Sequence, residues 1–182
     1  MSRTIALIGF MGCGKSYLGK YAARTLGMKF ADTDSLIEET AKMSISRIFA
    51  EQGEEVFRRI ETEVLRESCR DNHILATGGG IVKEAQNVDM LHAMGAVVVW
   101  LKISPERIFQ RLQRDNSRPL LAGAKGEEKL TRIRNLLQER ESLYQRAAQY
   151  IFIEDDFPES RVGEEFVAWL KREIFEKDGK NS

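Results

Sequence analysis

The chain has 182 residues, of which 42% are hydrophobic, and this is enough to build one globular domain around a continuous core. Its 28 lysines and arginines equal its 28 aspartates and glutamates, so the formal net charge at pH 7 is zero. Proteins that grip nucleic acid normally carry a basic surface, and this balance therefore predicts no nucleic-acid partner.

The first residues and the cysteines indicate the expected compartment. Residues 1–10 lack the basic, apolar and small-residue segments of a secretory signal, and no apolar run is long enough to cross a bilayer. Cys13 and Cys69 lie far apart without C-x-x-C spacing, which predicts neither a disulfide framework nor a thiolate zinc site. We therefore expect a cytoplasmic protein without membrane contact, and a monomer is the default expectation.

Short apolar runs alternate with helical segments along the chain. A helix is expected to begin after Lys15 and to end at Gly27, and Ser104 followed by Pro105 predicts another helix start. This alternation is typical of β-α units, so the predicted fold class is α/β, a three-layer α/β/α arrangement with a five-stranded, mainly parallel sheet. The strands are expected at residues 5–10, 29–31, 74–76, 97–101 and 150–153.

Residues 115–127 interrupt the helical pattern in the middle of the chain. Pro119, Gly123 and Gly126 stand there among small and charged residues, which is a composition typical of a loop. We interpret this stretch as a mobile lid within a single domain that covers residues 1–176. The polar residues 177–182 are expected to form a disordered tail.

Residues 9–16 read Gly-Phe-Met-Gly-Cys-Gly-Lys-Ser and match the phosphate-binding pattern G-x-x-x-x-G-K-[ST], the P-loop. Its glycines let the backbone curl around a phosphate with the N–H groups pointing inward. Lys15 is expected to neutralise the β- and γ-phosphates of a nucleotide, and Ser16 to offer its hydroxyl to Mg²⁺. A chance glycine-rich turn is the weaker alternative, because an apolar strand precedes the motif and a helix follows it.

Asp32, Thr33 and Asp34 follow the second expected strand, where a parallel sheet presents binding residues to its ligand. Alternation along an extended chain would turn Asp32 and Asp34 to the same side. One carboxylate would then hold the water shell of Mg²⁺, and the other would accept hydrogen bonds from substrate hydroxyls. The alternative is that Asp34 or Ser35 only caps the following helix. The residues alone do not decide between the two.

Motifs that define other nucleotide-binding classes are absent from the sequence. There is no N-K-x-D tetrapeptide for reading guanine, no D-x-x-G after the third expected strand, and no long second domain. GTPases and motors are therefore disfavoured, and a kinase for a metabolite or a nucleoside monophosphate remains. A regulatory module that binds ATP without turning it over is the alternative from a different class.

Five motifs occur in the order found in shikimate kinases, and the chain resembles that family through most of its length. These motifs are the P-loop, Asp32-Thr33-Asp34, Phe57-Arg58-Arg59-Ile60-Glu61, Gly78-Gly79-Gly80 and Arg118-Pro119-Leu120-Leu121. The resemblance implies a fold like that of nucleoside monophosphate kinases, Mg²⁺ and ATP as the phosphoryl donor, and the 3-hydroxyl of shikimate as the acceptor. It also implies a step on the route to chorismate and the aromatic amino acids.

The resemblance also implies which residues bind shikimate. Arg58 and Arg140 would grip the carboxylate, because a planar guanidinium offers paired parallel donors, and Glu61 would hold Arg58 in position. Residues 78–80 would let the backbone approach the substrate, and Asp34 would bind ring hydroxyls and accept the proton of the attacking one. The alternatives are a solvated surface ion pair of Arg58 with Glu61, a surface charge at Arg140, and an ordinary turn at the glycines.

For the nucleotide, the resemblance adds two arginines to the P-loop. Arg118 would close over ATP with the lid, and Arg111 would stack on adenine, the alternative being an exposed helical arginine. Many family members carry threonine or serine where this chain has Tyr17, and we expect the larger ring to alter only the packing beneath the nucleotide. The predicted ATP-binding residues are Gly12, Cys13, Gly14, Lys15, Ser16, Tyr17, Arg111 and Arg118.

The predicted site is completed by a metal ion and an acceptor. Ser16 is the predicted Mg²⁺ ligand, with Asp32 acting through water. A nucleoside monophosphate kinase or a gluconate-type kinase is the closest rival, because Arg58 and Arg140 would equally hold a substrate phosphate. The paired aspartates favour an acceptor rich in hydroxyls.

Overall fold

The computed structural model describes residues 3–68, 72–113, 115, 118–121 and 123–176. Cys69 and the tail expected at residues 177–182 lie outside the described residues. In the part of the chain that is described, no helix is both long and apolar enough to span a membrane.

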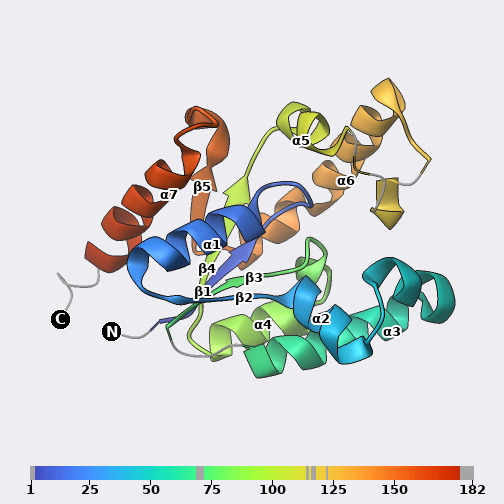
Figure 1. Ribbon diagram of the computed structural model, residues 1–182, viewed down its shortest axis with the longest axis horizontal. Coiled ribbons are helices and arrows are strands. Elements are labelled where there is room, and N and C mark those ends of the chain that lie inside the picture. Colours follow the sequence, from blue (N-terminus) through green and yellow to red (C-terminus); the bar gives the residue numbers. More distant parts are fainter. Residues whose placement is uncertain (1–2, 69–71, 114, 116–117, 122, 177–182) are drawn as a thin grey trace.

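The described residues form one five-stranded parallel sheet with the strand order β2-β3-β1-β4-β5 (Figure 1). Each of the five predicted strands is present within one or two residues of its expected ends, so the predicted α/β class is confirmed. The strands are β1 (Ile5–Ile8), β2 (Lys29–Asp32), β3 (His73–Ala76), β4 (Val97–Lys102) and β5 (Tyr150–Ile153).

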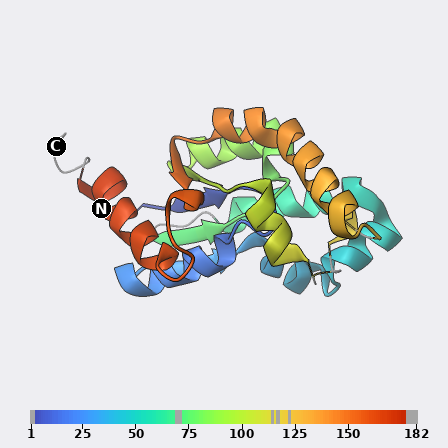
Figure 2. The ribbon, with the colours of Figure 1, turned by 90° about the horizontal axis from the view of Figure 1, so that it is seen from above.

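Helices cover both faces of the sheet, as Figure 2 shows with α1 and α7 on one side and α4 and α6 on the other. Successive side chains of a strand point to opposite faces, so β1 contributes to two separate cores. Ile5 and Leu7 pack beneath α1 and α7, whereas Ala6 and Ile8 pack beneath α4 and α6. The helices are α1 (Lys15–Leu26), α2 (Thr33–Ala41), α3 (Ile45–Ser68), α4 (Ala85–Ala93), α5 (Pro105–Leu112), α6 (Gly126–Ala147) and α7 (Val162–Leu170).

Local sequence signals set several helix ends. Gly27, in the left-handed region, ends α1 as predicted, whereas the helix starts at Lys15 itself, directly after the left-handed Gly14. The Ser104 side chain accepts a hydrogen bond from the first turn of α5. Short turns connect the longer elements. They are η1 (Ile81–Lys83), η2 (Pro119–Leu121) and η3 (Glu154–Asp156), with a π-helical turn η4 (Lys171–Phe175) after α7.

Two expectations about local structure are wrong. The first strand ends at Ile8 and not at Phe10, because Gly9, with φ of 144°, already turns the chain into the P-loop. Residues 115–127 are not irregular throughout, because η2 lies within them and Gly126 begins α6. Residues 116–117 and 122 of this stretch lie outside the described residues.

The α2–α3 pair extends beyond the carboxyl edge of the sheet and has a small core of its own. Ile37 of α2 packs there against Ile48 and Phe57 of α3. The α3 helix breaks at Gly53, whose φ of 86° is a value that glycine adopts readily. The second half of α3 therefore begins at Glu54 and runs along the site described below.

An aromatic cluster around Phe152 of β5 gives a test of the fold. Its ring is 1% exposed, and ring centroids of Phe157, Phe166 and Trp169 lie 5.0–5.4 Å away. We expect Phe152→Ala to lower the free energy of unfolding by about 3–5 kcal/mol, because it removes a buried ring and leaves a cavity. Denaturant unfolding measures this change.

The matched control is Ile151→Ala on the same strand. Ile151 points to the opposite face and is 40% exposed, so this variant is expected to cost less than about 1 kcal/mol. Equal losses for Phe152→Ala and Ile151→Ala would contradict the described packing of β5.

Candidate active site

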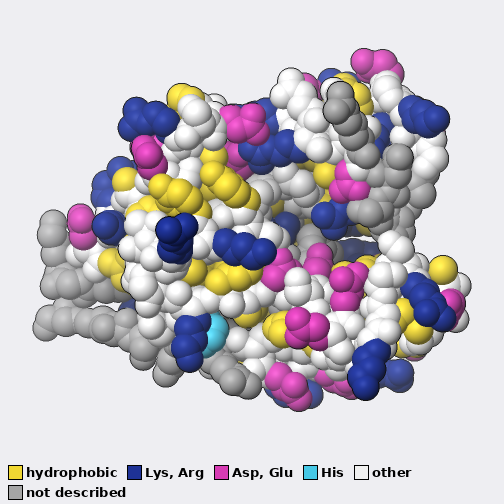
Figure 3. All heavy atoms as spheres, in the orientation of Figure 1, with side chains coloured by type: hydrophobic (Ala, Val, Ile, Leu, Met, Phe, Trp, Pro, Cys, Tyr) yellow, Lys and Arg dark blue, Asp and Glu magenta, His cyan; other side chains and the backbone are white. Residues whose placement is uncertain are grey.

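A cavity of about 610 Å³ opens at the carboxyl edge of the sheet. Figure 3 shows this hollow between the α2–α3 pair and α6, with acidic and basic side chains gathered in it. Of the predicted site residues, Cys13 and Arg111 do not line it. Those that do are Gly12, Gly14, Lys15, Ser16, Tyr17, Asp32, Asp34, Arg58, Gly78, Gly79, Gly80, Arg118 and Arg140.

The P-loop has the backbone geometry that its glycines predict. Gly12 and Gly14 have φ values of 78° and 89°, which side-chain-bearing residues rarely adopt. Gly14 is also the residue before α1, so the first turn of that helix presents its free N–H groups and its positive dipole end to the loop. Cys13 is fully buried in the hydrophobic core.

Lys15 lies inside the loop and not in solvent. It is 8% exposed, and its Nζ donates hydrogen bonds to the carbonyl oxygens of Gly9 at 2.8 Å and Phe10 at 2.9 Å. These contacts fix the ammonium group where the backbone curls. Its positive charge is therefore placed within the loop, beside the backbone of its first residues.

Asp32 and Asp34 reach the same cavity, but not by the predicted alternation. The extended chain ends at Asp32 and α2 begins at Thr33, so Asp34 lies in the first helical turn. The proposed capping by Asp34 or Ser35 is also wrong, because the Asp32 side chain caps α2 by accepting a hydrogen bond from the Asp34 N–H at 3.0 Å. The Ser16 hydroxyl donates to the other Asp32 oxygen at 2.5 Å.

Asp34 is partly buried in the first turn of α2. Burial raises the pKa of Asp34, and the neighbouring Asp32 carboxylate adds to that effect. The positive charges of Lys15 and Arg118 oppose it. Asp34 lines the same cavity as Lys15 and Arg118, and its raised pKa gives it a stronger tendency to take up a proton than an exposed aspartate has.

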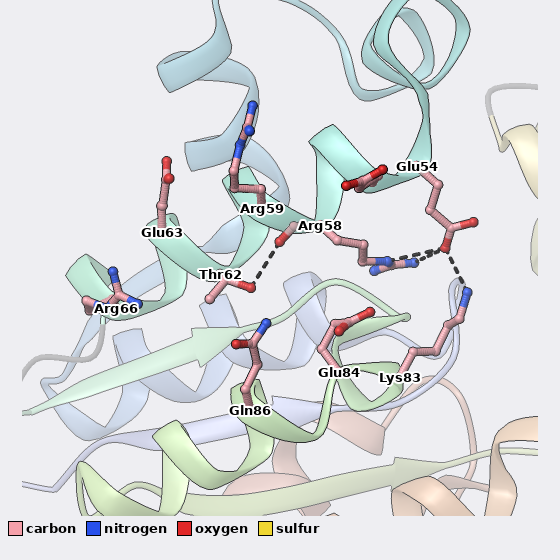
Figure 4. A pocket seen from close by; sticks show the side chains of 10 residues that line it. Glu54, Arg58, Arg59, Thr62, Glu63, Arg66, Lys83, Glu84 and Gln86 are labelled. Carbon is pink, nitrogen blue, oxygen red and sulfur yellow. Dashed lines mark hydrogen bonds and ion pairs between the residues drawn. The ribbon is translucent and has the colours of Figure 1, made fainter.

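Arg58 is held by two glutamates of its own helix. Its Nη1 donates to Glu61 Oε2 at 2.6 Å. Its Nη2 donates to Glu54 Oε1 at 3.0 Å, a contact that Figure 4 shows. The Glu61 side chain is fully buried and that of Arg58 is 13% exposed, so the alternative of a solvated surface pair is wrong. Burial raises the pKa of Glu61, although the adjacent Arg58 charge opposes this.

The glycines after β3 make room for these side chains. A Cβ on Gly78 would lie 2.6 Å from Glu61 Oε1, and a Cβ on Gly80 would lie 2.6 Å from Arg58 Nη2. Such distances are too short for real contacts. The glycines therefore do more than end a strand, because they let the charged side chains of α2 and α3 pack directly on the loop.

Arg140 of α6 reaches the same loop from the opposite side. It is 6% exposed, its Nη1 donates to the Gly79 carbonyl oxygen at 3.4 Å, and it lies over the Phe10 ring at 5.7 Å. The alternative of a surface charge is therefore wrong. Arg58 and Arg140 come from different helices and line one cavity.

Sequence reasoning missed two residues that fix the glycine loop. The Thr33 hydroxyl is buried and accepts a hydrogen bond from the Gly78 N–H at 3.0 Å. The buried Tyr144 hydroxyl donates to the Gly79 carbonyl oxygen at 2.5 Å, and the Tyr144 ring stacks on Trp100. Their places in the sequence could have indicated both residues. Thr33 stands between two aspartates, and Tyr144 lies one helical turn after Arg140.

Arg111 of α5 contacts the backbone of the P-loop. Its Nη1 donates to the Gly12 carbonyl oxygen at 3.4 Å, and its Nη2 pairs with Glu154, a residue that is 1% exposed, and with Glu159. The alternative of an exposed helical arginine is wrong.

Arg118 also lines the cavity, and its side chain is 41% exposed, with its Nε 3.3 Å from Asp115 Oδ2. A buried lysine that sequence reasoning missed holds the chain nearby. Lys129 Nζ donates to the carbonyl oxygens of Leu112 at 2.5 Å and Asp115 at 2.8 Å. Lys129, near the start of α6, therefore fixes the chain that leads to Arg118 by hydrogen bonds to that helix.

A P-loop joined to a cavity lined by three arginines and two aspartates defines a small-molecule kinase of the P-loop class. Comparison with known proteins gives the family. The family model described as shikimate kinase matches residues 11–171.

Individual relatives agree with that match. The shikimate kinase of Caldanaerobacter subterraneus subsp. tengcongensis is 42% identical over 93% of this chain and 97% of its own length. The solved shikimate kinase from Acinetobacter baumannii, in complex with shikimate, aligns with a TM-score of 0.83 at 35% identity over 93% of this chain and 92% of that chain. The one from Bacteroides thetaiotaomicron aligns with a TM-score of 0.85 at 33% identity, covering 94% and 98%. The chain therefore belongs to the shikimate kinase family, whose members are ATP-dependent kinases.

The raised pKa of Asp34 predicts a gain in stability when its charge is removed. An acid with a raised folded-state pKa contributes stability that is complete below its unfolded pKa of about 3.9 and is lost as the pH rises through the raised value. At neutral pH the ionised Asp34 therefore destabilises the fold. We expect Asp34→Asn to raise the thermal unfolding midpoint at neutral pH, with the difference disappearing near pH 3 (about one unit below that value).

Calorimetry across this pH range measures the effect, and Asp89→Asn is the control. Asp89 is exposed on α4, so the same chemical change there is expected to leave the midpoint nearly unchanged. A lower midpoint for Asp34→Asn than for the parent at neutral pH would contradict this account of Asp34.

Proposed function

We propose that this protein transfers the γ-phosphoryl group of ATP to the 3-hydroxyl of shikimate, giving 3-phosphoshikimate and ADP on the route to chorismate. One observation carries the proposal beyond family membership: Arg58, Arg140 and Asp34 line the same cavity as the P-loop. Shikimate has one carboxylate and three hydroxyls. Two guanidinium groups match the carboxylate, and carboxylate oxygens match the hydroxyls.

The hydrogen bonds of Arg58 leave a suitable edge for a carboxylate. Among the described residues, Glu54 and Glu61 take three of its five N–H groups, which leaves one N–H on each terminal nitrogen. Two such groups lie parallel in a guanidinium and suit a bidentate contact. With Arg140 on the other side of the cavity, they would fix the ring and direct its hydroxyls towards Asp34.

On the nucleotide side, the P-loop N–H groups and the start of α1 would hold the phosphates, with Lys15 adding its charge. Ser16 and Asp32 offer a hydroxyl and a carboxylate 2.5 Å apart, and such hard oxygen donors suit Mg²⁺. When bound with ATP, Mg²⁺ neutralises charge on the phosphates. In this proposal Ser16 would bind the ion directly, and Asp32 would act through water.

Asp34 would accept the proton of the attacking hydroxyl. Its raised pKa brings it closer to that role, although phosphoryl transfer depends mainly on alignment and charge neutralisation. Lys15 and Arg118 line the same cavity as Asp34, and in this proposal both would contact the transferred phosphoryl.

The remaining parts of the proposal concern the lid, the adenine contact and the cellular setting of the protein. We propose that residues 115–127 form a lid within one domain and that Arg118 closes over ATP with them, which excludes water from the transfer. Arg111 would present a guanidinium face to adenine while its edge supports Gly12. The protein would act as a cytoplasmic monomer without nucleic-acid or membrane partners.

A coupled ADP-release assay tests the substrate. Shikimate, quinate, gluconate and AMP are compared as acceptors at matched concentrations with Mg-ATP. Turnover with shikimate far above the others is expected. Preference for AMP or gluconate would refute the acceptor, and ATP binding without turnover on any acceptor would favour a regulatory module.

Lys15→Met is expected to lower kcat by at least about 10²-fold, because it removes the positive charge beside the phosphates. Lys20→Met, on the exposed side of the same helix, is the matched control and should leave kcat unchanged. Steady-state kinetics measure both variants, and near-parental kcat in Lys15→Met would remove Lys15 from the mechanism.

Gly80→Ala is expected to weaken shikimate binding by about tenfold or more while sparing ATP affinity. Gly80 has φ of −105°, so alanine causes no backbone strain, and the added Cβ acts by displacing the Arg58 guanidinium from 2.6 Å. Isothermal titration measures the two affinities separately. Unchanged shikimate affinity would show that the position of Arg58 against Gly80 is unimportant for the acceptor.

A further inference from the structure

We infer that Lys83 is a positioning residue for the acceptor: it neutralises Glu54 and thereby keeps the charge of Arg58 available to an anionic substrate. The inference rests on the proposed function. Lys83 does not line the main cavity. It ends η1, the turn that directly follows the glycine loop.

A second cavity, of about 600 Å³, lies on the far side of Arg58 (Figure 4). The second half of α3, η1 and the start of α4 line it, and Arg58 lines both this cavity and the main one. In Figure 4 the side chains of Glu54, Arg58 and Lys83 point towards one another. Arg58 therefore also faces a second cavity. The charged groups there determine how much of its positive charge is neutralised before a substrate binds.

One oxygen of Glu54 serves both cations. Its Oε1 accepts from Lys83 Nζ at 2.7 Å, from Arg58 Nη2 at 3.0 Å and from Arg58 Nε at 3.3 Å. The ammonium contact is the shortest of the three. Lys83 and Arg58 together lower the pKa of Glu54, with the Lys83 hydrogen bond as the larger cause, so Glu54 remains ionised and shared between them.

The surroundings of Arg58 are rich in carboxylates. Glu54 and Glu61 contact it directly, and the charges of Asp34 and Glu84 lie near enough to raise the pKa of Glu61. Without Lys83, two carboxylates would face one guanidinium before any substrate arrived. The substrate carboxylate would then meet a weaker positive potential, whereas with Lys83 the charge of Glu54 is matched from outside the main cavity.

The backbone places Lys83 for this role. The Lys83 N–H donates to the Gly80 carbonyl oxygen at 2.9 Å, and Gly80 is the residue on which the Arg58 guanidinium packs. The turn η1 therefore supports Arg58 through Gly80, and it also carries Lys83, whose positive charge balances that of Glu54. Because the turn is held by backbone contacts, removing the ammonium group alone leaves its conformation intact.

The first test is the kinetics of Lys83→Met. We expect the KM for shikimate to rise about three- to fivefold, the size typical of losing one partly exposed charge partner, with kcat and the KM for ATP unchanged. Lys83→Arg, which keeps the charge, should restore the parental KM. The matched control is Lys102→Met, because Lys102 also pairs with an exposed glutamate, Glu141, at 2.7 Å, and it should leave the KM for shikimate unchanged.

The second test asks whether Lys83 acts through Glu54. In a Glu54→Gln background, Lys83→Met should no longer raise the KM, because no carboxylate is left to neutralise. No rise in the parental background, or an equal rise in both backgrounds, would overturn the inference. Either result is distinct from failure of the proposed function, which would appear as absent shikimate turnover in the parent enzyme.

Discussion

The buried carboxylate of Glu61 constrains the whole acceptor side of the site. Its side chain is fully buried, and among the described residues its Oε2 has Arg58 as partner while its Oε1 has no hydrogen bond. A buried charge is costly unless it is paired, so Arg58 is drawn inward from the surface of α3. The loop after β3 must then lack side chains at Gly78 and Gly80, because both carboxylate and guanidinium occupy that space.

The parallel sheet brings the two halves of the site together. The ends of β1, β2 and β3 lie level, since Leu7 pairs with Ala76 and Ala76 pairs with Asp32. The P-loop, Asp32 at the end of β2, Asp34 in the first turn of α2 and the glycine loop therefore lie at one edge, with α3 and α6 adding one arginine each. Lys15, Arg58 and Arg140 bring positive charge to this cavity, and burial raises the pKa of Asp34, which lines it too.

The fold was largely predictable because its signals are local. Buried strands read as short apolar runs, and glycine or serine marks the helix ends. The P-loop and the family were predictable from motifs, and both are confirmed. The orientation of the Asp34 side chain was not predictable. A helix begins directly after the strand there, so side chains repeat every 3.6 residues and no longer alternate every two. Contacts across the fold were also hidden: nothing near Arg111 in sequence indicates Glu154, and nothing near Lys129 indicates the carbonyl oxygen of Leu112.

The most direct test of the account is a crystal structure of the protein with ADP, Mg²⁺ and shikimate. The account predicts the shikimate carboxylate within about 3 Å of the guanidinium groups of Arg58 and Arg140, with the 3-hydroxyl directed towards Asp34 and the β-phosphate. Arg58 should keep its contacts to Glu54 and Glu61. A carboxylate bound elsewhere, with Arg58 contacting only its two glutamates, would contradict the central claim that this arginine and its neighbours form the acceptor site.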